Sequence, residues 1–290
     1  MILRRAMRVR RIALLALLVA AAPLAAQSRP PVEHRDIAYV TTNGVASQLD
    51  VYQQAGTTPT PVLLYFHGGA WTTGQRPAAA SSFGSFLKLG FSVVSVSYRL
   101  SGVAPAPAAV QDARCAVKWV HDNAARYGFD PNRIVVHGTS AGGHLALLAA
   151  MLPARWSRDL PQCAGVPRVA AVLDYYGPAD LLGASAVSHR TREWLRDGGA
   201  ALGRELSPIA QVRAGHPPVL IVHGDADPTV PHEQSVRLRD ALAKAGVTVR
   251  LHTVSGGQHG KFEPAQRAAI VQTVADFLRE QRILPAADTP

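Results

Sequence analysis

The pentapeptide Gly138-Thr139-Ser140-Ala141-Gly142 constrains the fold of this chain more than any other segment. The β-branched run before it, residues 133–137, predicts a buried strand, and the Ala- and Leu-rich run after it, residues 143–151, predicts a helix. A G-x-S-x-G between a strand and a helix is typical of a nucleophile elbow, a turn that strains the serine backbone and leaves no room for a Cβ beside it. Such a turn lifts Ser140 Oγ above the sheet edge and points the amide of Ala141 toward a place where an oxyanion is held. We therefore predict a nucleophilic serine, the alternative being a plain glycine-rich turn.

Strand-like and helix-like segments alternate along the rest of the chain. Residues 36–41 and 48–52 are expected to be edge strands joined by a Thr-Asn-Gly turn. Residues 61–66 are expected to be a central strand, because this run is apolar throughout. This alternation predicts an α/β fold with a mostly parallel, twisted sheet and helices on both faces, and its ligand site lies beyond the carboxyl ends of the strands. Further strands are expected at residues 91–98, 169–175, 217–223 and 247–253. Helices are expected at residues 78–89, 108–127, 231–245 and 262–282.

The N-terminus has the pattern of a secretory signal peptide. Five arginines within the first 11 residues are followed by an apolar run at residues 12–22 and by small residues up to Ala26. The apolar run is shorter than the roughly 20 residues that span a bilayer, so an uncleaved anchor is the less favoured interpretation. We expect cleavage near Ala26, no stable membrane span afterwards, and a secreted or periplasmic protein.

The remainder of the chain, residues 27–290, is predicted to be a single domain, because no low-complexity linker or internal repeat divides it. Residues 179–214 interrupt the alternation and are interpreted as a small cap over the strand ends, the alternative being an inert surface excursion.

Charge and cysteine content narrow the functional classes. The formal net charge is +10, and five of these charges belong to the N-terminal arginines. The rest is mildly basic without a basic run interleaved with aromatics, which argues against a nucleic-acid partner. Cys115 and Cys163 are the two cysteines, and export to an oxidising compartment favours a disulfide between them over two buried thiols.

Donors for an oxyanion are predicted directly after the strand at residues 61–66, in His67-Gly68-Gly69-Ala70-Trp71. Consecutive glycines let the backbone approach a ligand and turn its amides inward. We assign the amides of Gly69 and Ala70, with that of Ala141, to an oxyanion hole.

Two ring side chains of the same segment receive other roles. His67 precedes the hole and is expected to brace the loop through a hydrogen bond, whereas Trp71 is expected to line the substrate pocket. Elsewhere, His144 is expected to serve helix packing and His252 to be a core or edge residue of its strand.

The general base and the acid that orients it are predicted in two later loops. Asp227 and Asp225 both follow the strand at residues 217–223, and Asp227 is favoured because Asp225 lies nearer the strand and can satisfy turn amides. Asp180 is a more distant alternative. His259 lies in a glycine-rich loop after the last strand and is the predicted base.

The order Ser140, Asp227, His259 is the order of α/β-hydrolases. Together with His67–Trp71, residues 138–143 and Tyr98-Arg99-Leu100, it resembles that superfamily from about Arg35 to Arg282. More narrowly, the motifs are similar to bacterial esterases and lipases of the feruloyl- and acetylxylan-esterase-like and hormone-sensitive-lipase-like branches. His-Gly-Gly-Ala-Trp replaces the His-Gly-Gly-Gly of the latter branch, whose long N-terminal cap is also missing.

The resemblance implies an α/β-hydrolase fold and a cofactor-free carboxylic ester hydrolase acting on a small-molecule or polysaccharide-linked ester. No His, Asp and Glu cluster with metal-ligand spacing is found, so no metal is expected. The alternatives are a serine peptidase of the prolyl-oligopeptidase kind, which would need an extra propeller domain, an amidase resembling arylformamidase, and a non-catalytic binding protein. The acyl-chain length and the oligomeric state are not encoded in these motifs.

Overall fold

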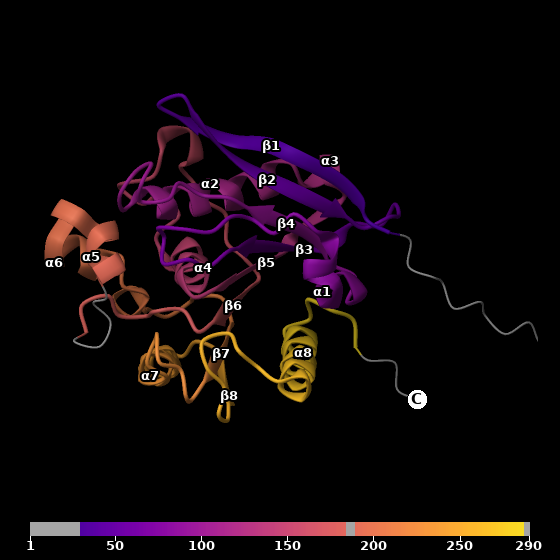
Figure 1. Ribbon diagram of the computed structural model, residues 1–290. Coiled ribbons are helices and arrows are strands. Elements are labelled where there is room, and N and C mark those ends of the chain that lie inside the picture. Colours follow the sequence, from indigo (N-terminus) through magenta and orange to yellow (C-terminus); the bar gives the residue numbers. More distant parts are fainter. Residues whose placement is uncertain (1–29, 184–188, 287–290) are drawn as a thin grey trace, which may run out of the picture.

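A computed structural model describes residues 30–183 and 189–286 of the chain (Figure 1). Its strands form an eight-stranded sheet in the order β1-β2-β4-β3-β5-β6-β7-β8. Only β2 runs against the others, because it pairs antiparallel with both β1 and β4 while every other pair is parallel. The strands are β1 (Val32–Thr42), β2 (Val45–Gln53), β3 (Thr60–Phe66), β4 (Ser92–Val96), β5 (Phe129–Thr139), β6 (Ala171–Tyr175), β7 (Val219–Gly224) and β8 (Val249–Val254).

Helices cover both faces of this sheet, which confirms the predicted α/β-hydrolase fold. On β5, Ile134 and Val136 face the core shared with α2, α3, α4 and α7, whereas Val135 faces the core shared with η1 and α8. The helices are α1 (Gly84–Lys88), α2 (Ala108–Asp122), α3 (Ala124–Tyr127), α4 (Ala141–Met151), α5 (His189–Leu195), α6 (Gly199–Glu205), α7 (Glu233–Lys244) and α8 (Pro264–Glu280), with short 3₁₀ turns η1 (Ala80–Phe83), η2 (Pro161–Cys163), η3 (Arg196–Gly198) and η4 (Pro208–Gln211). None of these helices is long and apolar enough to cross a membrane.

Three elements differ from the sequence-based prediction. β2 is not an edge strand, since β1 covers one side of it and β4 the other. The helix expected over residues 108–127 is divided at Asn123, which has φ of −101° and ψ of 9° and whose side-chain and backbone amides both donate to the Trp119 carbonyl, at 2.9 Å and 3.0 Å. The helix expected over residues 78–89 is reduced to η1 and the five-residue α1.

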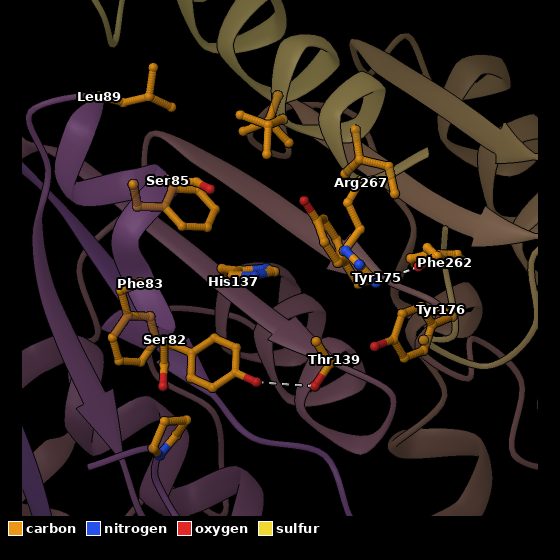
Figure 2. A pocket seen from close by; sticks show the side chains of 17 residues that line it. Ser82, Phe83, Ser85, Leu89, His137, Thr139, Tyr175, Tyr176, Phe262 and Arg267 are labelled. Atoms are coloured by element: carbon orange, nitrogen blue, oxygen red, sulfur yellow. Dashed lines mark hydrogen bonds between the residues drawn. The ribbon is translucent and has the colours of Figure 1, made fainter. Parts of the chain in front are cut away.

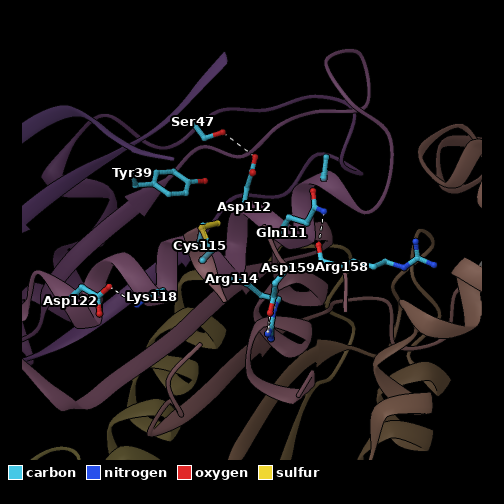
Figure 3. Close-up of a disulfide and its surroundings, with 12 residues drawn as sticks. Tyr39, Ser47, Gln111, Asp112, Arg114, Cys115, Lys118, Asp122, Arg158 and Asp159 are labelled. Carbon is cyan, nitrogen blue, oxygen red and sulfur yellow. Dashed lines mark hydrogen bonds and ion pairs between the residues drawn. A yellow bond between two sulfur atoms is a disulfide. The ribbon is translucent and has the colours of Figure 1, made fainter. Parts of the chain in front are cut away.

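A disulfide joins Cys115 on α2 to Cys163 in η2 (Figure 3). It is buried beside Val40 of β1, and Arg114, the neighbour of Cys115, pairs with Asp159 of the connecting loop at 2.5 Å. The bridge therefore fixes the irregular segment after α4 against α2. Closing a loop with a sequence separation of 48 residues contributes about 4 kcal/mol in the chain-entropy account.

The segment predicted to form a cap contains α5, η3, α6 and η4, and residues 184–188 within it lie outside the described part of the chain, as does the predicted signal peptide at residues 1–26. In Figure 1, α5 and α6 form a lobe at one end of the molecule. Trp194 of α5 is fully buried, and its carbonyl accepts a hydrogen bond from the Ala106 amide at 2.9 Å. The lobe is thus packed onto the body of the protein through an aromatic anchor.

Candidate active site

Ser140 lies in the turn between β5 and α4, with φ of 54° and ψ of −121°. This left-handed backbone is costly for a residue with a Cβ and is held by the amide of Ser140, which donates to the Tyr175 carbonyl at 2.8 Å. A Cβ on Gly142 would lie 2.0 Å from the Phe66 carbonyl oxygen, and one on Gly138 would lie 2.2 Å from the backbone of Gly142. The strained serine and the crowded glycines are the features that the elbow motif predicts.

Three side chains from three loops form a continuous hydrogen-bonded chain at the carboxyl ends of the strands. His259 Nε2 lies 2.9 Å from Ser140 Oγ, and His259 Nδ1 lies 2.6 Å from Asp227 Oδ2. Because a carboxylate only accepts, Nδ1 of His259 carries the proton and Nε2 is free to accept the proton of the serine hydroxyl. The structure therefore brings together the predicted nucleophile, base and acid in the arrangement that serine acyl transfer requires.

The environment of Asp227 keeps it ionised. Its side chain is fully buried, and its Oδ1 accepts the amides of Thr229 at 2.7 Å and Val230 at 3.0 Å. Burial alone would raise the pKa of Asp227, but hydrogen bonds from two histidines and these two amides outweigh it and hold that pKa well below its usual range. Asp227 is therefore a carboxylate at neutral pH.

The two alternative aspartates are used elsewhere. Asp225 is exposed and accepts a hydrogen bond from the Gly256 amide at 2.7 Å. It thus satisfies a turn amide, as its position near the strand predicts. Asp180 accepts the amides of Leu182 and Gly183 and pairs with Arg237 at 3.1 Å. Neither carboxylate makes a hydrogen bond to His259.

His223 is a member of this site that sequence reasoning missed. It is fully buried at the end of β7, and its Nε2 lies 2.9 Å from the Val230 carbonyl and 3.2 Å from Asp227 Oδ2. Since a carbonyl only accepts, Nε2 is the protonated nitrogen, and Nδ1 accepts from Ser235 Oγ at 2.6 Å. The signal for it was its place two residues ahead of Asp225, at the start of the loop that carries the acid.

The loop that supplies the predicted oxyanion donors lies beside the elbow. A Cβ on Gly68 would lie 3.5 Å from Ser140 Cβ, and a Cβ on Gly69 would lie 2.0 Å from the Thr73 carbonyl oxygen. Gly69 has φ of 119°, and Ala70 has φ of 53°. In the described part of the chain, the amides of Gly69 and Ala70 donate no hydrogen bond that the structure records, and the amide of Ala141 opens α4, where a helix leaves its amides unpaired.

The ring side chains of this loop are packed rather than exposed. His67 Nδ1 lies 2.7 Å from the Gly68 carbonyl, and its ring stacks on Tyr98, whose hydroxyl donates to the His67 carbonyl at 2.9 Å. Trp71 is only 2% exposed and stacks on Trp194, with ring centroids 4.3 Å apart. The loop-bracing role predicted for His67 therefore fits its contacts, whereas the ring of Trp71, expected to line the substrate pocket, is buried against Trp194 of α5.

The two histidines expected to serve packing, His144 and His252, have structural partners. His144 is fully buried and donates to the Leu206 carbonyl at 2.7 Å, which links α4 to the end of α6, and burial lowers the pKa of His144 to about 4. His252 of β8 lies 3.1 Å from Thr273 Oγ1 of α8. Within residues 30–183 and 189–286, no group of three His, Cys, Asp or Glu side chains is arranged to hold a metal ion.

Comparisons with known proteins agree with this geometry. The family profile named BD-FAE matches residues 49–242, and a profile described as TAP-like protein matches residues 202–290. Esterase LipQ of Mycobacterium tuberculosis is 32% identical over 276 residues, which cover 86% of this chain and 64% of that protein. The chain thus spans less than two thirds of the length of this curated relative.

Two solved structures superpose on this chain over nearly the whole of their own length. A truncated carbohydrate esterase from gut microbiota superposes with a TM-score of 0.73 at 29% identity, covering 88% of this chain and 98% of the other. Butyrate-bound esterase Est2 of the planctomycete Thermogutta terrifontis superposes with a TM-score of 0.75 at 28% identity, covering 87% and 95% of the two chains.

Proposed function

The chain belongs to the BD-FAE family of α/β-hydrolases, and on that premise we propose that it is a serine carboxylic ester hydrolase working through an acyl-enzyme intermediate. The observation that carries the proposal is the hydrogen-bonded chain from Ser140 through His259 to Asp227, at 2.9 Å and 2.6 Å. It is set in a strained turn next to unpaired backbone amides, which is the environment that acyl transfer needs.

Each group has one task in the acylation step. His259 Nε2 takes the hydroxyl proton while Ser140 Oγ bonds to the ester carbonyl carbon, and the carbonyl oxygen becomes an oxyanion. The amides of Gly69, Ala70 and Ala141 stabilise this oxyanion. The imidazolium then protonates the leaving alcohol as the carbon–oxygen ester bond breaks, and the carboxylate of Asp227 stabilises the positive charge meanwhile.

Deacylation repeats the sequence with water. His259 removes a proton from a water molecule that attacks the acyl carbon, and returns that proton to Ser140 Oγ as the carboxylic acid leaves. Over the two steps one water molecule is consumed and one alcohol and one carboxylic acid are released, so atoms and charge balance.

The substrate class we propose is a small or carbohydrate-linked acyl ester, and the setting we propose is outside the cytoplasm. The similarity to a carbohydrate esterase supports the first part. The disulfide between Cys115 and Cys163 supports the second, since such bonds persist in oxidising compartments.

A fluorophosphonate probe combined with p-nitrophenyl acetate hydrolysis tests the proposal. Wild type should be labelled and active, and Ser140→Ala should lose the label and on the order of 10⁵-fold in kcat, because triad members act as a unit. Ser255→Ala is the matched control, an exposed serine in the loop that leads to His259. A labelled Ser140→Ala protein, or one retaining more than about a hundredth of the activity, would refute the nucleophile assignment. Hydrolysis of peptide or anilide substrates in preference to esters would favour the peptidase or amidase alternative.

A further inference from the structure

Two consecutive tyrosines at the end of β6 contact both the nucleophile and the base of the candidate triad. The carbonyl of Tyr175 accepts a hydrogen bond from the Ser140 amide at 2.8 Å. Tyr176, the next residue, has a left-handed backbone with φ of 45°, and its amide donates to the Val222 carbonyl of β7 at 2.8 Å. A residue with a Cβ is strained in this conformation, and such strain is concentrated at functional sites. These hydrogen bonds fix the dipeptide to the nucleophile turn on one side and to β7 on the other.

The ring of Tyr176 packs on the ring of His259. The two rings meet edge to face, with centroids 4.7 Å apart and an angle of 62° between their planes. Tyr176 is 9% exposed and borders a cavity of about 400 Å³, and in Figure 2 its hydroxyl group points toward Thr139. An edge-to-face contact at this distance is favourable beyond the area that it buries. The base therefore has an aromatic partner in addition to its two hydrogen-bonding partners.

The main chain after His259 lies against the same tyrosine. Gly260 has φ of 69°, and a Cβ on it would lie 2.6 Å from the hydroxyl oxygen of Tyr176, closer than van der Waals contact allows. The hydroxyl group thus fills the space beside the backbone of Gly260. Tyr176 contacts the base loop at two places, the imidazole through its ring and the following residue through its hydroxyl group.

The two hydrogen bonds of His259 fix a line and leave the plane of its ring free to turn. Nδ1 is bonded to Asp227 and Nε2 to Ser140, so the ring can rotate about the line that joins its two nitrogens. Such a rotation turns the N–H bond and the lone pair away from their partners, and hydrogen bonds weaken as their angles bend. The His259 side chain is 22% exposed, so packing does not enclose it on all sides. A contact outside the line of the two nitrogens is needed to hold the plane, and Tyr176 supplies one.

We propose that Tyr176 is a positioning residue for His259, and that its ring holds the imidazole in the plane that joins Ser140 to Asp227. The inference rests on the proposed function, because it takes His259 as the base. A catalytic group that is displaced by about 1 Å can lose on the order of 100-fold in rate. The loss concerns proton transfer and not substrate binding, so it belongs in kcat and not in KM.

Hydrolysis of p-nitrophenyl acetate by Tyr176→Leu and Tyr176→Phe tests the proposal. Leucine has no flat ring, and we expect kcat of Tyr176→Leu to fall about 10- to 100-fold while KM stays within about threefold. Tyr176→Phe keeps the ring and should retain kcat within about threefold. An equal loss of kcat in the two variants would assign the effect to the hydroxyl group. A raised KM with unchanged kcat would make Tyr176 a wall of the substrate pocket, and either result overturns the proposal.

Phe262→Leu is the matched control. Phe262 is buried in the same aromatic cluster, with its ring centroid 6.0 Å from that of Tyr176, and among the described residues no ring contact between Phe262 and His259 is recorded. This variant removes a ring from the cluster and leaves the contact with His259 in place, so its kcat should stay within about threefold of wild type. Urea unfolding of each variant confirms that folded proteins are compared. Equal kcat losses in Phe262→Leu and Tyr176→Leu would show that the cluster acts through packing alone.

Gly260→Ala covers the case in which Tyr176→Leu does not fold. The added methyl group meets the hydroxyl oxygen of Tyr176, and combining it with Tyr176→Phe removes that oxygen and leaves Cζ at 3.1 Å as the nearest atom. The strain of alanine at this φ is common to both proteins and cancels between them. We expect Gly260→Ala to lower kcat at least tenfold and the double variant to regain at least threefold of it. A double variant as slow as Gly260→Ala would overturn the proposal.

The rate constant of fluorophosphonate labelling separates this inference from the proposed function. Labelling requires Ser140 and its base in place, and it requires no turnover of an ester. A wild type that is labelled but hydrolyses no ester would refute the proposed substrate class. The order of labelling rates would still test Tyr176, with Tyr176→Phe close to wild type and Tyr176→Leu at least tenfold slower. An active wild type whose labelling rate is shared by Tyr176→Leu would keep the esterase and overturn the role of Tyr176.

Discussion

Two carboxylates two positions apart in one loop differ in what they contact. Asp227 is fully buried and bonded to His259, whereas Asp225 is exposed and holds a turn amide. Asp227→Asn should reduce kcat by on the order of 10⁴, because the amide favours the wrong tautomer of the imidazole. Asp225→Asn keeps an oxygen for the Gly256 amide and should change kcat less than about threefold. Initial rates on p-nitrophenyl acetate compare the two variants, and a reversed order would assign the acid to Asp225.

His223 is a positioning residue for the catalytic aspartate proposed at Asp227. Its Nε2 proton is shared between the Val230 carbonyl and Asp227 Oδ2. His223→Phe should reduce kcat about tenfold with little change in KM, since a hydrogen bond to a charged group contributes roughly 1.5–3 kcal/mol.

Ser235→Ala is the comparison for this effect. It removes the partner of the other ring nitrogen of His223 and leaves the contact with Asp227 in place. Its kcat should stay closer to that of wild type. If both variants lose the same activity and the same stability, His223 supports only the packing of β7 against α7.

The candidate residues could be predicted as far as their roles depend on chain order. Ser140, Asp227 and His259 each follow a recognisable strand, and parallel strands bring their carboxyl ends together. His223 could not be predicted, because its role depends on which nitrogen carries the proton and on the fold of the loop back to Val230. The position of Trp71 after the glycines predicts a place in the substrate pocket, and the pattern does not show that its ring is buried against Trp194.

At the scale of elements, the alternation of strands and helices was predictable and the order of the strands was not. β2 has the alternating pattern of an edge strand, and nothing in that pattern shows that β1 pairs along its outer side. The helix is divided at Asn123, where the polar side chain shares the Trp119 carbonyl with the residue's own backbone amide.

The contact between α5 and the loop of residues 67–71 gives a prediction at the scale of elements. Trp194 of α5 stacks on Trp71, a residue with φ of 59°, and the ring of His144 lies edge-on to both. Trp194→Ala should destabilise the fold by about 3–5 kcal/mol. It should also lower kcat, since the strained backbone of the loop loses a support.

Trp194→Phe and Trp119→Ala are the controls for this prediction. The first keeps a ring on Trp71 and should recover most of kcat. The second removes a partly buried ring on α2 that packs on Tyr127, far along the chain from the loop. Chemical denaturation and initial rates measure the two effects, and equal kcat values for the two alanine variants would show that the cap does not support the loop.

For the whole molecule, the sheet and its cores follow from the apolar pattern, but the cleft between α1 and α8 does not. This cavity of about 400 Å³ is lined on one side by residues of η1 and α1 and on the other by residues of α8, elements that lie far apart in the sequence. A sequence pattern indicates which residues face a core, and it does not show where two helices fail to meet.

The free energy of unfolding should depend on pH through one buried acid, Asp174. Asp174 of β6 is fully buried, its Oδ1 accepts the Gly177 amide at 3.0 Å, and burial raises its pKa to about 8 from an ordinary 3.8. Between those two pH values the folded protein binds a proton that the unfolded chain has lost, so stability falls as pH rises, by at most ~1.4 kcal/mol per pH unit. Below pH 3.8 Asp174 is protonated in both the folded and the unfolded state, and its contribution to stability is fully present. Above pH 8 this contribution is lost. The amide side chain that Asp174→Asn introduces does not titrate. Urea unfolding at pH 5 and pH 7.5 should therefore show that the free energy of unfolding of the variant, relative to wild type, increases by a few kcal/mol between the two pH values. Parallel stability profiles for the two proteins would mean that Asp174 is ionised in the fold.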